Sequence, residues 1–225
     1  MKLMIDCADY DKIKEIIEFY PIDGVTTNPS ILSKLRKNPY EILIQIRNLI
    51  GYDKELHVQV ISKEIDNIID EAYKICEVLG DKTFIKIPIN KQGLKALIIL
   101  SNKKFNTTAT AIYTPIQAYL AAKAGANYVA PYINRIDNLG FDGVQVAKKI
   151  HNILKNNDFK TEILAASFKN SYQVLELCEY GISASTISTD VIDCLINSKD
   201  ISFAINNFIN DFEETYGKGK TMIDF

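Results

Sequence analysis

Lys86 interrupts an apolar segment, Thr83–Ile89 (T-F-I-K-I-P-I), and its position in that segment points to chemistry. Side chains alternate between the two faces of a strand, so Ile85 and Ile87 share one face and Lys86 points to the other. If that face is the inside of the fold, burial disfavours the ammonium form and lowers the pKa of the amine. A neutral lysine amine attacks carbonyl groups and forms Schiff bases. The segment predicts a nucleophilic lysine; the alternative is a lysine that reaches solvent or pairs with a carboxylate.

The same alternation places other polar side chains on the inner face of predicted strands. In L-M-I-D-C it separates Asp6 from the apolar face, and in E-L-H-V-Q-V-I it separates His57 and Gln59. Near the carboxyl ends of the strands, the inward groups are Asp6, Gln59, Lys86, Thr110, Tyr132 and Ser167. Barrel active sites are built at that end, so the set predicts one catalytic site. His57 lies deeper than Gln59, and we expect a buried, hydrogen-bonded histidine rather than a catalytic one.

Basic side chains follow the sixth and seventh predicted strands. Arg135 follows the sixth in Y-I-N-R-I-D, and Ser167 and Lys169 follow the seventh in A-A-S-F-K. A guanidinium, an ammonium and a hydroxyl close together would bind a phosphate monoester. The alternative is that Arg135 forms a surface ion pair with Asp137 or Asp142.

Short apolar runs alternate with amphipathic segments along nearly the whole chain, which predicts a single (β/α)8 TIM barrel over residues 1–225. The predicted strands are Lys2–Cys7, Gly24–Thr26, Leu56–Ile61, Thr83–Ile89, Asn106–Ile112, Tyr128–Ile133, Glu162–Ser167 and Ala184–Ile187. The predicted helices between and after them are Tyr10–Phe19, Ile31–Leu49, Lys63–Leu79, Gln92–Ser101, Pro115–Lys123, Val144–Leu154, Ser171–Tyr180 and Asp190–Ile196. A doubly wound open sheet is the alternative, but no GxGxxG motif follows the first strand. An additional apolar helix is expected at residues 201–216, packed on the barrel or on a neighbouring subunit.

Composition narrows the classes of function. The chain has 225 residues and a net charge of −2, so no overall basic field favours nucleic acid or anionic membranes. Its four cysteines are scattered, and the two histidines lack a metal-ligand spacing, so we expect reduced thiols and no metal site. No apolar stretch approaches the roughly 18–20 residues needed to span a bilayer, and Asp6 interrupts the first apolar run. We therefore expect a soluble, cytoplasmic protein.

Four motifs resemble the transaldolase superfamily, in particular its small fructose-6-phosphate aldolase and transaldolase-like members. They are G-V-T-T-N-P-S-I-L at Gly24–Leu32, F-I-K-I-P at Phe84–Pro88, Y-V-A-P-Y-I-N-R-I-D at Tyr128–Asp137 and A-A-S-F-K at Ala165–Lys169. The resemblance covers essentially the whole chain. It implies a class I aldol enzyme that needs no metal or other cofactor, acts on sugar phosphates and carries its Schiff base on Lys86. It also implies a homo-oligomer, a pentamer or decamer, in which the last helix reaches a neighbour.

The resemblance assigns further roles. Asp6 matches the family's first-strand aspartate, Asn28 its substrate-binding asparagine, and Thr26 lines the site. Transaldolases typically carry glutamate where this chain has Gln59, and phenylalanine where it has Tyr132. Glutamine with tyrosine resembles fructose-6-phosphate aldolases, with Gln59, Thr110 and Tyr132 holding the catalytic water.

The resulting expectation is an aldolase that interconverts fructose 6-phosphate with dihydroxyacetone and glyceraldehyde 3-phosphate. The first alternative is a transaldolase of the pentose phosphate pathway, which transfers dihydroxyacetone between sedoheptulose 7-phosphate and glyceraldehyde 3-phosphate. A more remote alternative is a sugar-phosphate-binding barrel without catalysis.

Overall fold

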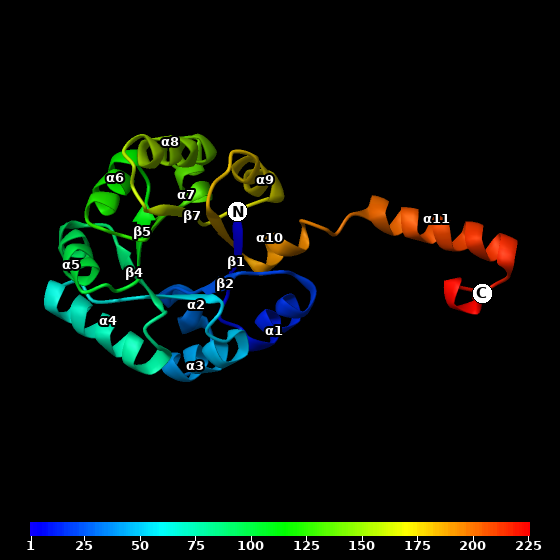
Figure 1. The fold of residues 1–225 in the computed structure, drawn as a ribbon, viewed down its shortest axis with the longest axis horizontal. Coiled ribbons are helices and arrows are strands. Elements are labelled where there is room, and N and C mark those ends of the chain that lie inside the picture. Colours follow the sequence, from blue (N-terminus) through cyan, green and yellow to red (C-terminus); the bar gives the residue numbers. More distant parts are fainter.

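Eight parallel strands close into a barrel in the order β1 to β8 in a computed structural model that describes all 225 residues (Figure 1). The strands are β1 Lys2–Asp6, β2 Gly24–Thr26, β3 Glu55–Gln59, β4 Phe84–Pro88, β5 Thr107–Ile112, β6 Tyr128–Pro131, β7 Glu162–Ala165 and β8 Ala184–Ile187. Because β1 pairs with both β2 and β8, the sheet has no edge. The predicted (β/α)8 barrel is confirmed, and the open-sheet alternative is wrong.

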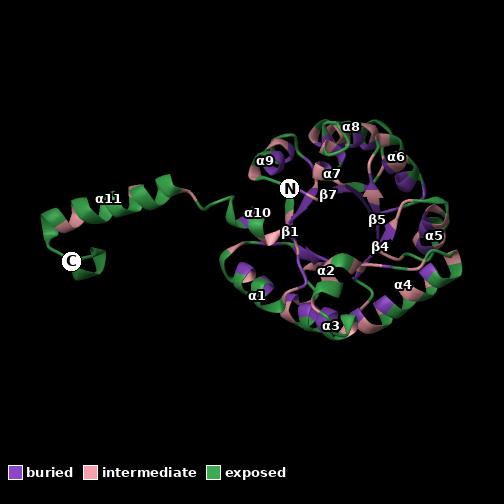
Figure 2. Cartoon of the chain, turned by 180° about the vertical axis from the view of Figure 1, so that it is seen from behind, coloured by how far each residue is buried: buried purple, intermediate pink, exposed green.

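Except for α11, the helices surround the barrel on its outside, with their buried faces turned toward the strands (Figure 2). The long helices are α1 Tyr10–Phe19, α3 Pro39–Ile50, α4 Ile65–Leu79, α5 Lys91–Asn102, α6 Pro115–Lys123, α8 Gly143–Asn156, α9 Ser171–Glu179 and α11 Lys199–Tyr216. Shorter helical segments are α2 Pro29–Lys34, α7 Ile133–Asp137, α10 Thr189–Asp193 and a final 3₁₀ turn at Met222–Asp224. In α4 the buried residues recur at steps of three and four, as amphipathic packing requires: Ile68, Ala72, Ile75 and Leu79.

Two apolar cores lie on the two faces of the barrel. A cluster of 44 buried residues includes Ile5, Val58, Ile85 and Ile87, which have the outward parity of their strands. A small cluster of inward-pointing side chains lies inside the barrel. It consists of Met4, Tyr128, Leu164 and Ala184, with Phe84 packed against them. The alternation from the sequence therefore assigns inward and outward residues correctly in these strands.

The prediction of one helix over Ile31–Leu49 is wrong, because two helices, α2 and α3, occupy that stretch. Between them Arg36 has a left-handed backbone, with φ 51°, which interrupts the helical path. Asn38 then caps the new helix by accepting a hydrogen bond from Tyr40 N at 2.9 Å, and Pro39 occupies its first turn. Proline disfavours a helical conformation in the preceding residue, so the helix restarts instead of continuing.

The sixth strand also ends earlier than expected. It stops at Pro131, and the residues from Ile133 form the short helix α7. Tyr132 retains one bridge to Ala166 of the neighbouring segment, so it lies where the strand gives way to the helix.

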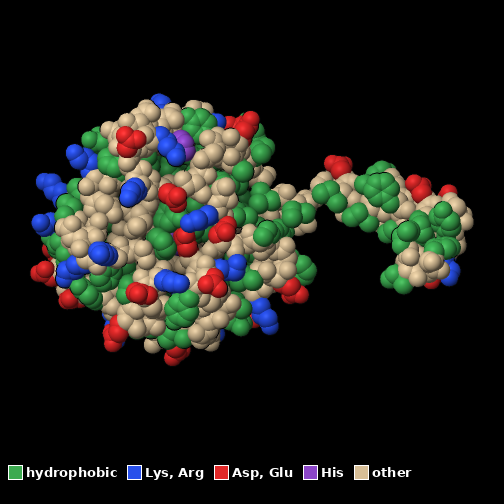
Figure 3. All heavy atoms as spheres, viewed as in Figure 1, with side chains coloured by type: hydrophobic (Ala, Val, Ile, Leu, Met, Phe, Trp, Pro, Cys, Tyr) green, Lys and Arg blue, Asp and Glu red, His purple; other side chains and the backbone are tan.

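Helix α11 projects away from the barrel and contains no buried residue (Figures 1 and 3). Its exposed apolar side chains include Ile201, Phe203, Ile205, Phe208 and Ile209. No helix of the protein is both long enough and apolar enough to cross a membrane.

Candidate active site

Lys86 lies on β4, near the end of the barrel where the strands terminate, and its side chain is buried. The residue is 5% exposed, and Nζ donates a hydrogen bond to the backbone oxygen of Thr27 at 2.8 Å. Burial lowers the pKa of Lys86 from its ordinary value, and the negative charge of Asp6 opposes this effect only in part. Such an amine is deprotonated at a lower pH than an exposed lysine and is a better nucleophile near neutrality.

Thr27, whose carbonyl accepts the Lys86 hydrogen bond, is itself held in place by two hydrogen bonds to β3. Its backbone nitrogen and its hydroxyl both donate to the carbonyl oxygen of His57, at 2.9 and 3.1 Å. The acceptor of the Lys86 hydrogen bond therefore belongs to a segment anchored on the adjacent strand β3.

Gln59 and Thr110 lie on the strands β3 and β5 that flank β4, and Tyr132 directly follows β6. Gln59 is in register with Lys86 across β3 and β4, and Thr110 with Pro88 across β4 and β5. The Thr110 hydroxyl lies 3.0 Å from the Tyr132 hydroxyl, and either can donate. Gln59 Oε1 is buried and has no hydrogen-bond partner in the chain, which leaves an acceptor for a water or substrate hydroxyl.

A local irregularity in β5 accompanies the placement of Thr110. The pairing of β5 with β6 shifts register between Ala109 and Ile112, and Ala111 has a left-handed φ of 58°. Bulges of this kind redirect side chains beside active sites.

Asp6 and Thr26 contact each other directly. The Thr26 hydroxyl donates to Asp6 Oδ1 at 2.8 Å and lies 2.7 Å from the hydroxyl of Thr186 on β8. Thr186 was missed from the sequence, although it shares the inward parity of Ala184. Thr26 on β2 thus connects Asp6 on β1 with Thr186 on β8.

Asn28 forms the N-cap of α2, and its Oδ1 accepts a hydrogen bond from Ile31 N at 3.0 Å. This bond fixes the orientation of the side-chain amide, because only the carbonyl oxygen can accept. The amide nitrogen remains available as a donor.

A polar cluster around the buried His57 closes the opposite end of the barrel. His57 Nδ1 lies 2.9 Å from the Thr108 hydroxyl and Nε2 lies 3.1 Å from Glu55 Oε2, while Lys2 donates to Glu55 and Tyr128. Burial lowers the pKa of His57 to about 4, against the opposing effect of the Glu55 carboxylate. His57 is therefore the buried, hydrogen-bonded histidine that the sequence predicted.

The structure brings Arg135 and Ser167 onto adjoining segments. Asn134 N donates to Ser167 O at 2.8 Å, and Ser167 has a left-handed φ of 61°. The Arg135 guanidinium lies over the Tyr132 ring, 4.6 Å from its centroid, and forms no ion pair with Asp137 or Asp142. Lys169 is exposed and its backbone nitrogen donates to Gln173 Oε1 at 2.7 Å, so the phosphate-binding cluster of Arg135, Ser167 and Lys169 stays a prediction.

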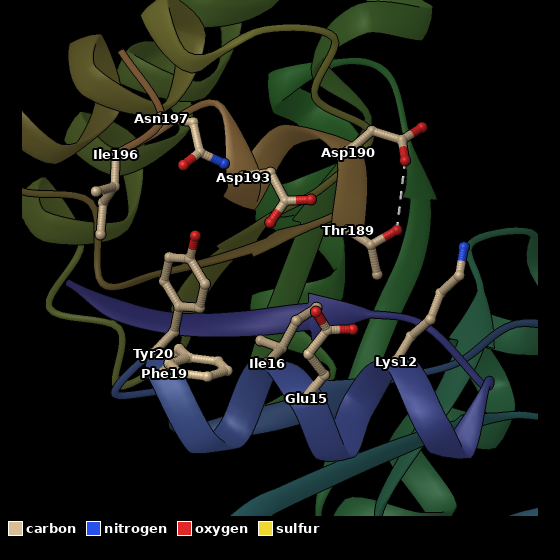
Figure 4. A pocket seen from close by; sticks show the side chains of 10 residues that line it. All are labelled: Lys12, Glu15, Ile16, Phe19, Tyr20, Thr189, Asp190, Asp193, Ile196 and Asn197. Carbon is tan, nitrogen blue, oxygen red and sulfur yellow. Dashed lines mark hydrogen bonds between the residues drawn. The ribbon is translucent and has the colours of Figure 1, made fainter. Parts of the chain in front are cut away.

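A surface cavity of about 460 Å³ lies outside the barrel, between α1 and α10 (Figure 4). Lys12, Glu15 and Phe19 come from α1, and Asp190 and Asp193 from α10. No candidate catalytic residue lines this cavity, and no group of three or more His, Cys, Asp or Glu residues is placed to hold a metal ion.

Comparison with known proteins gives whole-chain similarities. A family model described as Transaldolase/Fructose-6-phosphate aldolase matches residues 3–222. A "Probable transaldolase" of Thermoplasma volcanium is 38% identical over 226 residues, covering 99% of this chain and 100% of that protein. A "Probable fructose-6-phosphate aldolase" of Streptococcus pneumoniae is 39% identical over 213 residues, covering 94% and 96%. A "Probable transaldolase" of Thermoplasma acidophilum is 36% identical over 224 residues, covering 99% and 100%.

Proposed function

The chain belongs to the transaldolase/fructose-6-phosphate aldolase family, and from this membership and the geometry around Lys86 we propose that it is a class I aldolase for fructose 6-phosphate. Family membership makes it an aldolase or transaldolase enzyme. The observation that carries the proposal is the buried Lys86 amine, with a lowered pKa, held on the Thr27 carbonyl beside the inward groups of the neighbouring strands. No metal or other cofactor takes part in the proposed reaction.

The first step is attack of the Lys86 amine on the C2 ketone of the ketose. The carbinolamine loses water and becomes a protonated Schiff base, which withdraws electrons from the adjacent C3–C4 bond. Asp6 and Asn28 position the hydroxyls at C1 and C3. Their fixed contacts with Thr26 and Ile31 support this role, because both side chains are held in one orientation.

Carbon–carbon cleavage follows. A water held by Gln59, Thr110 and Tyr132 accepts the proton of the C4 hydroxyl. The C3–C4 electron pair moves into the iminium, so glyceraldehyde 3-phosphate leaves and a three-carbon enamine remains on Lys86. Protonation of C3 and hydrolysis of the imine release dihydroxyacetone and restore the free amine.

The proposed site for the substrate phosphate is Arg135 with Ser167. Support comes from the backbone bond between Asn134 and Ser167 and from the exposed guanidinium beside Tyr132. Lys169, two residues after Ser167 and exposed, adds a positive charge to this site.

The second candidate function is dihydroxyacetone transfer. The same enamine would then attack an aldose phosphate such as erythrose 4-phosphate instead of taking a proton, and would yield sedoheptulose 7-phosphate. Gln59 and Tyr132 favour cleavage, because the amide is a weaker base than a carboxylate and the phenol adds an acid/base group next to Thr110. A barrel that only binds sugar phosphates would leave the buried Lys86 amine unused.

For assembly we propose a homo-oligomeric ring, a pentamer or decamer, in which α11 packs on an adjacent subunit. Phe203 and Phe208 are 68% and 70% exposed on a helix that makes no apolar core with its own barrel. Such a surface favours a protein partner. The four cysteines are free thiols, which supports a cytoplasmic setting.

The test is a product assay. The protein is incubated with fructose 6-phosphate, with and without erythrose 4-phosphate, and free dihydroxyacetone and sedoheptulose 7-phosphate are quantified. The proposal predicts dihydroxyacetone as the main three-carbon product in both incubations. Rapid formation of sedoheptulose 7-phosphate with almost no dihydroxyacetone would instead establish the transferase.

A further inference from the structure

Gln173, in the first turn of α9, is a buried polar residue that none of the proposed catalytic steps uses. It is only 8% exposed, although glutamine is mostly a surface residue. Its Oε1 accepts a hydrogen bond from Lys169 N at 2.7 Å, and its Nε2 donates to Asp137 Oδ2 at 2.6 Å. The side chain therefore joins the segment after β7 to the end of α7.

Asp137 receives bonds from two helices. Its Oδ1 accepts from Gly143 N, the first residue of α8, at 2.7 Å, while Oδ2 accepts from Gln173. The approach at Gly143 is close, since a Cβ there would lie 2.3 Å from Ile133 O. The carboxylate thus ties the end of α7 to the starts of α8 and α9.

Helix α7 is therefore attached at its start to the segment that carries Ser167, and at its end to α9, through Gln173. At its start, Ile133 N donates to Ala166 O at 2.9 Å and Asn134 N donates to Ser167 O at 2.8 Å. At its end, the attachment is the bond between Asp137 and Gln173. Arg135 lies between the two attachments. A helix of five residues has little stability of its own, so these bonds, together with the buried side chains of Ile133 and Ile136, determine its orientation.

We propose that Gln173 is a positioning residue for phosphate recognition: through Asp137 it holds Arg135 in a fixed place relative to Ser167. The inference rests on the proposed function for the assignment of the substrate phosphate to Arg135 and Ser167. Gln173 and Asp137 set the preference for phosphorylated over unphosphorylated substrates and leave the chemistry at Lys86 unchanged.

The donor and the acceptor of the hydrogen bond between Gln173 Nε2 and Asp137 Oδ2 can be exchanged by substitution. In Gln173→Glu the acceptor for Lys169 N remains, but the donor to Asp137 is lost and two carboxylates meet. In Asp137→Asn the new amide nitrogen faces either Gln173 Nε2 or Gly143 N, which are both donors, so one of the two hydrogen bonds that hold residue 137 is lost. In the double variant Gln173→Glu/Asp137→Asn, the asparagine can donate to the glutamate and still accept from Gly143 N, at unchanged net charge.

The experiment measures kcat and KM for aldol addition of dihydroxyacetone to glyceraldehyde 3-phosphate and to unphosphorylated glyceraldehyde. Each single variant should lower kcat/KM for the phosphorylated aldehyde about 10-fold, chiefly through KM, because small displacements of a binding group carry losses of up to ~10²-fold. The value for glyceraldehyde should stay close to that of the wild type. The double variant should recover most of the lost preference, as expected for two coupled residues.

Equal losses on both aldehydes, an unchanged preference in both single variants, or no recovery in the double variant would each overturn the proposal. Circular dichroism and thermal unfolding of every variant identify a general loss of structure. Failure of the proposed function is a separate result, because it appears as absence of aldol activity in the wild-type enzyme. A wild type that is active but shows no preference for the phosphorylated aldehyde would also overturn the role of Gln173.

Discussion

The Arg135 guanidinium lies over the ring of Tyr132, 4.6 Å from its centroid, and the hydroxyl of the same tyrosine lies 3.0 Å from Thr110. The face of the ring therefore makes a cation–π interaction with Arg135, while the hydroxyl pairs with the hydroxyl of Thr110. One residue connects the proposed phosphate site with the proposed acid/base site, and substitutions can separate its two contributions.

Tyr132→Phe keeps the ring under Arg135 and removes only the hydroxyl. We expect cleavage of fructose 6-phosphate to fall by roughly 10²–10⁴-fold in kcat, because an acid/base group next to the catalytic water is lost. KM should change little. Steady-state kinetics check this, with Tyr132→Leu as the matched variant that also raises KM. A Tyr132→Phe enzyme with wild-type kcat would contradict a role for the phenol.

Gln59→Glu should raise dihydroxyacetone transfer relative to cleavage. The buried Oε1 of Gln59 has no partner in the chain, so a carboxylate there gains a direct contact with the catalytic water. A carboxylate is the stronger base and can return a proton to the oxygen of an acceptor aldehyde. The ratio of sedoheptulose 7-phosphate to dihydroxyacetone measures the effect, with Gln59→Leu as the apolar control. A ratio that falls or stays constant would argue against control of the reaction by this position.

His57 makes the stability of the fold dependent on pH. Its pKa in the folded protein is about 4, against 6.5 ordinarily, because burial disfavours the charged ring. Between these values the unfolded chain binds a proton that the folded chain does not, so the free energy of unfolding falls by up to about 1.4 kcal/mol per pH unit on acidification. Chemical denaturation from pH 7 to pH 4 should show this slope. The slope should be reduced in His57→Gln and retained in His151→Gln; a slope that survives His57→Gln would contradict the assignment.

Removal of α11 should dissociate the protein. A chain that ends at Asn197, before the Ser198 N-cap, lacks the exposed apolar side chains of the helix. Light scattering should give the mass of a ring for the full chain and a smaller species after truncation. A full chain that remains at about 25.4 kDa would exclude the ring. A truncated chain that remains fully assembled would instead exclude the role of α11.

Much of the fold and of the site could be predicted from the sequence, because the side chains of a barrel strand point alternately into the barrel and toward the surrounding helices. Asp6, His57, Gln59 and Lys86 were assigned to the inner face by this rule alone. The two helices between Pro29 and Ile50 were merged, because their apolar residues keep a helical period while the break at Arg36 depends on one backbone torsion.

Residues that act through partners distant in the chain were harder to predict. Thr186 meets Thr26 across 160 positions, and Gln173 meets Asp137 across 36, so no local pattern marks either pair. Lys169 shows the converse: it follows the seventh strand as expected, yet its backbone rather than its ammonium is held, by Gln173. The motif gives the place of Lys169 in the chain, whereas the hydrogen bond of its backbone depends on a residue of α9.

The central claim is that Lys86 is the amine that forms the Schiff base. The most direct measurement of this role is reductive trapping on the intact chain, followed by peptide mass spectrometry. The wild-type enzyme is incubated with dihydroxyacetone and sodium borohydride, and Lys86→Met serves as the matched variant without an amine. In parallel, activity is measured before and after treatment with EDTA.

If Lys86 forms the Schiff base, a single three-carbon adduct appears on Lys86, Lys86→Met remains folded without an adduct, and EDTA leaves the activity unchanged. An adduct on another lysine, or loss of activity with EDTA, would contradict this role.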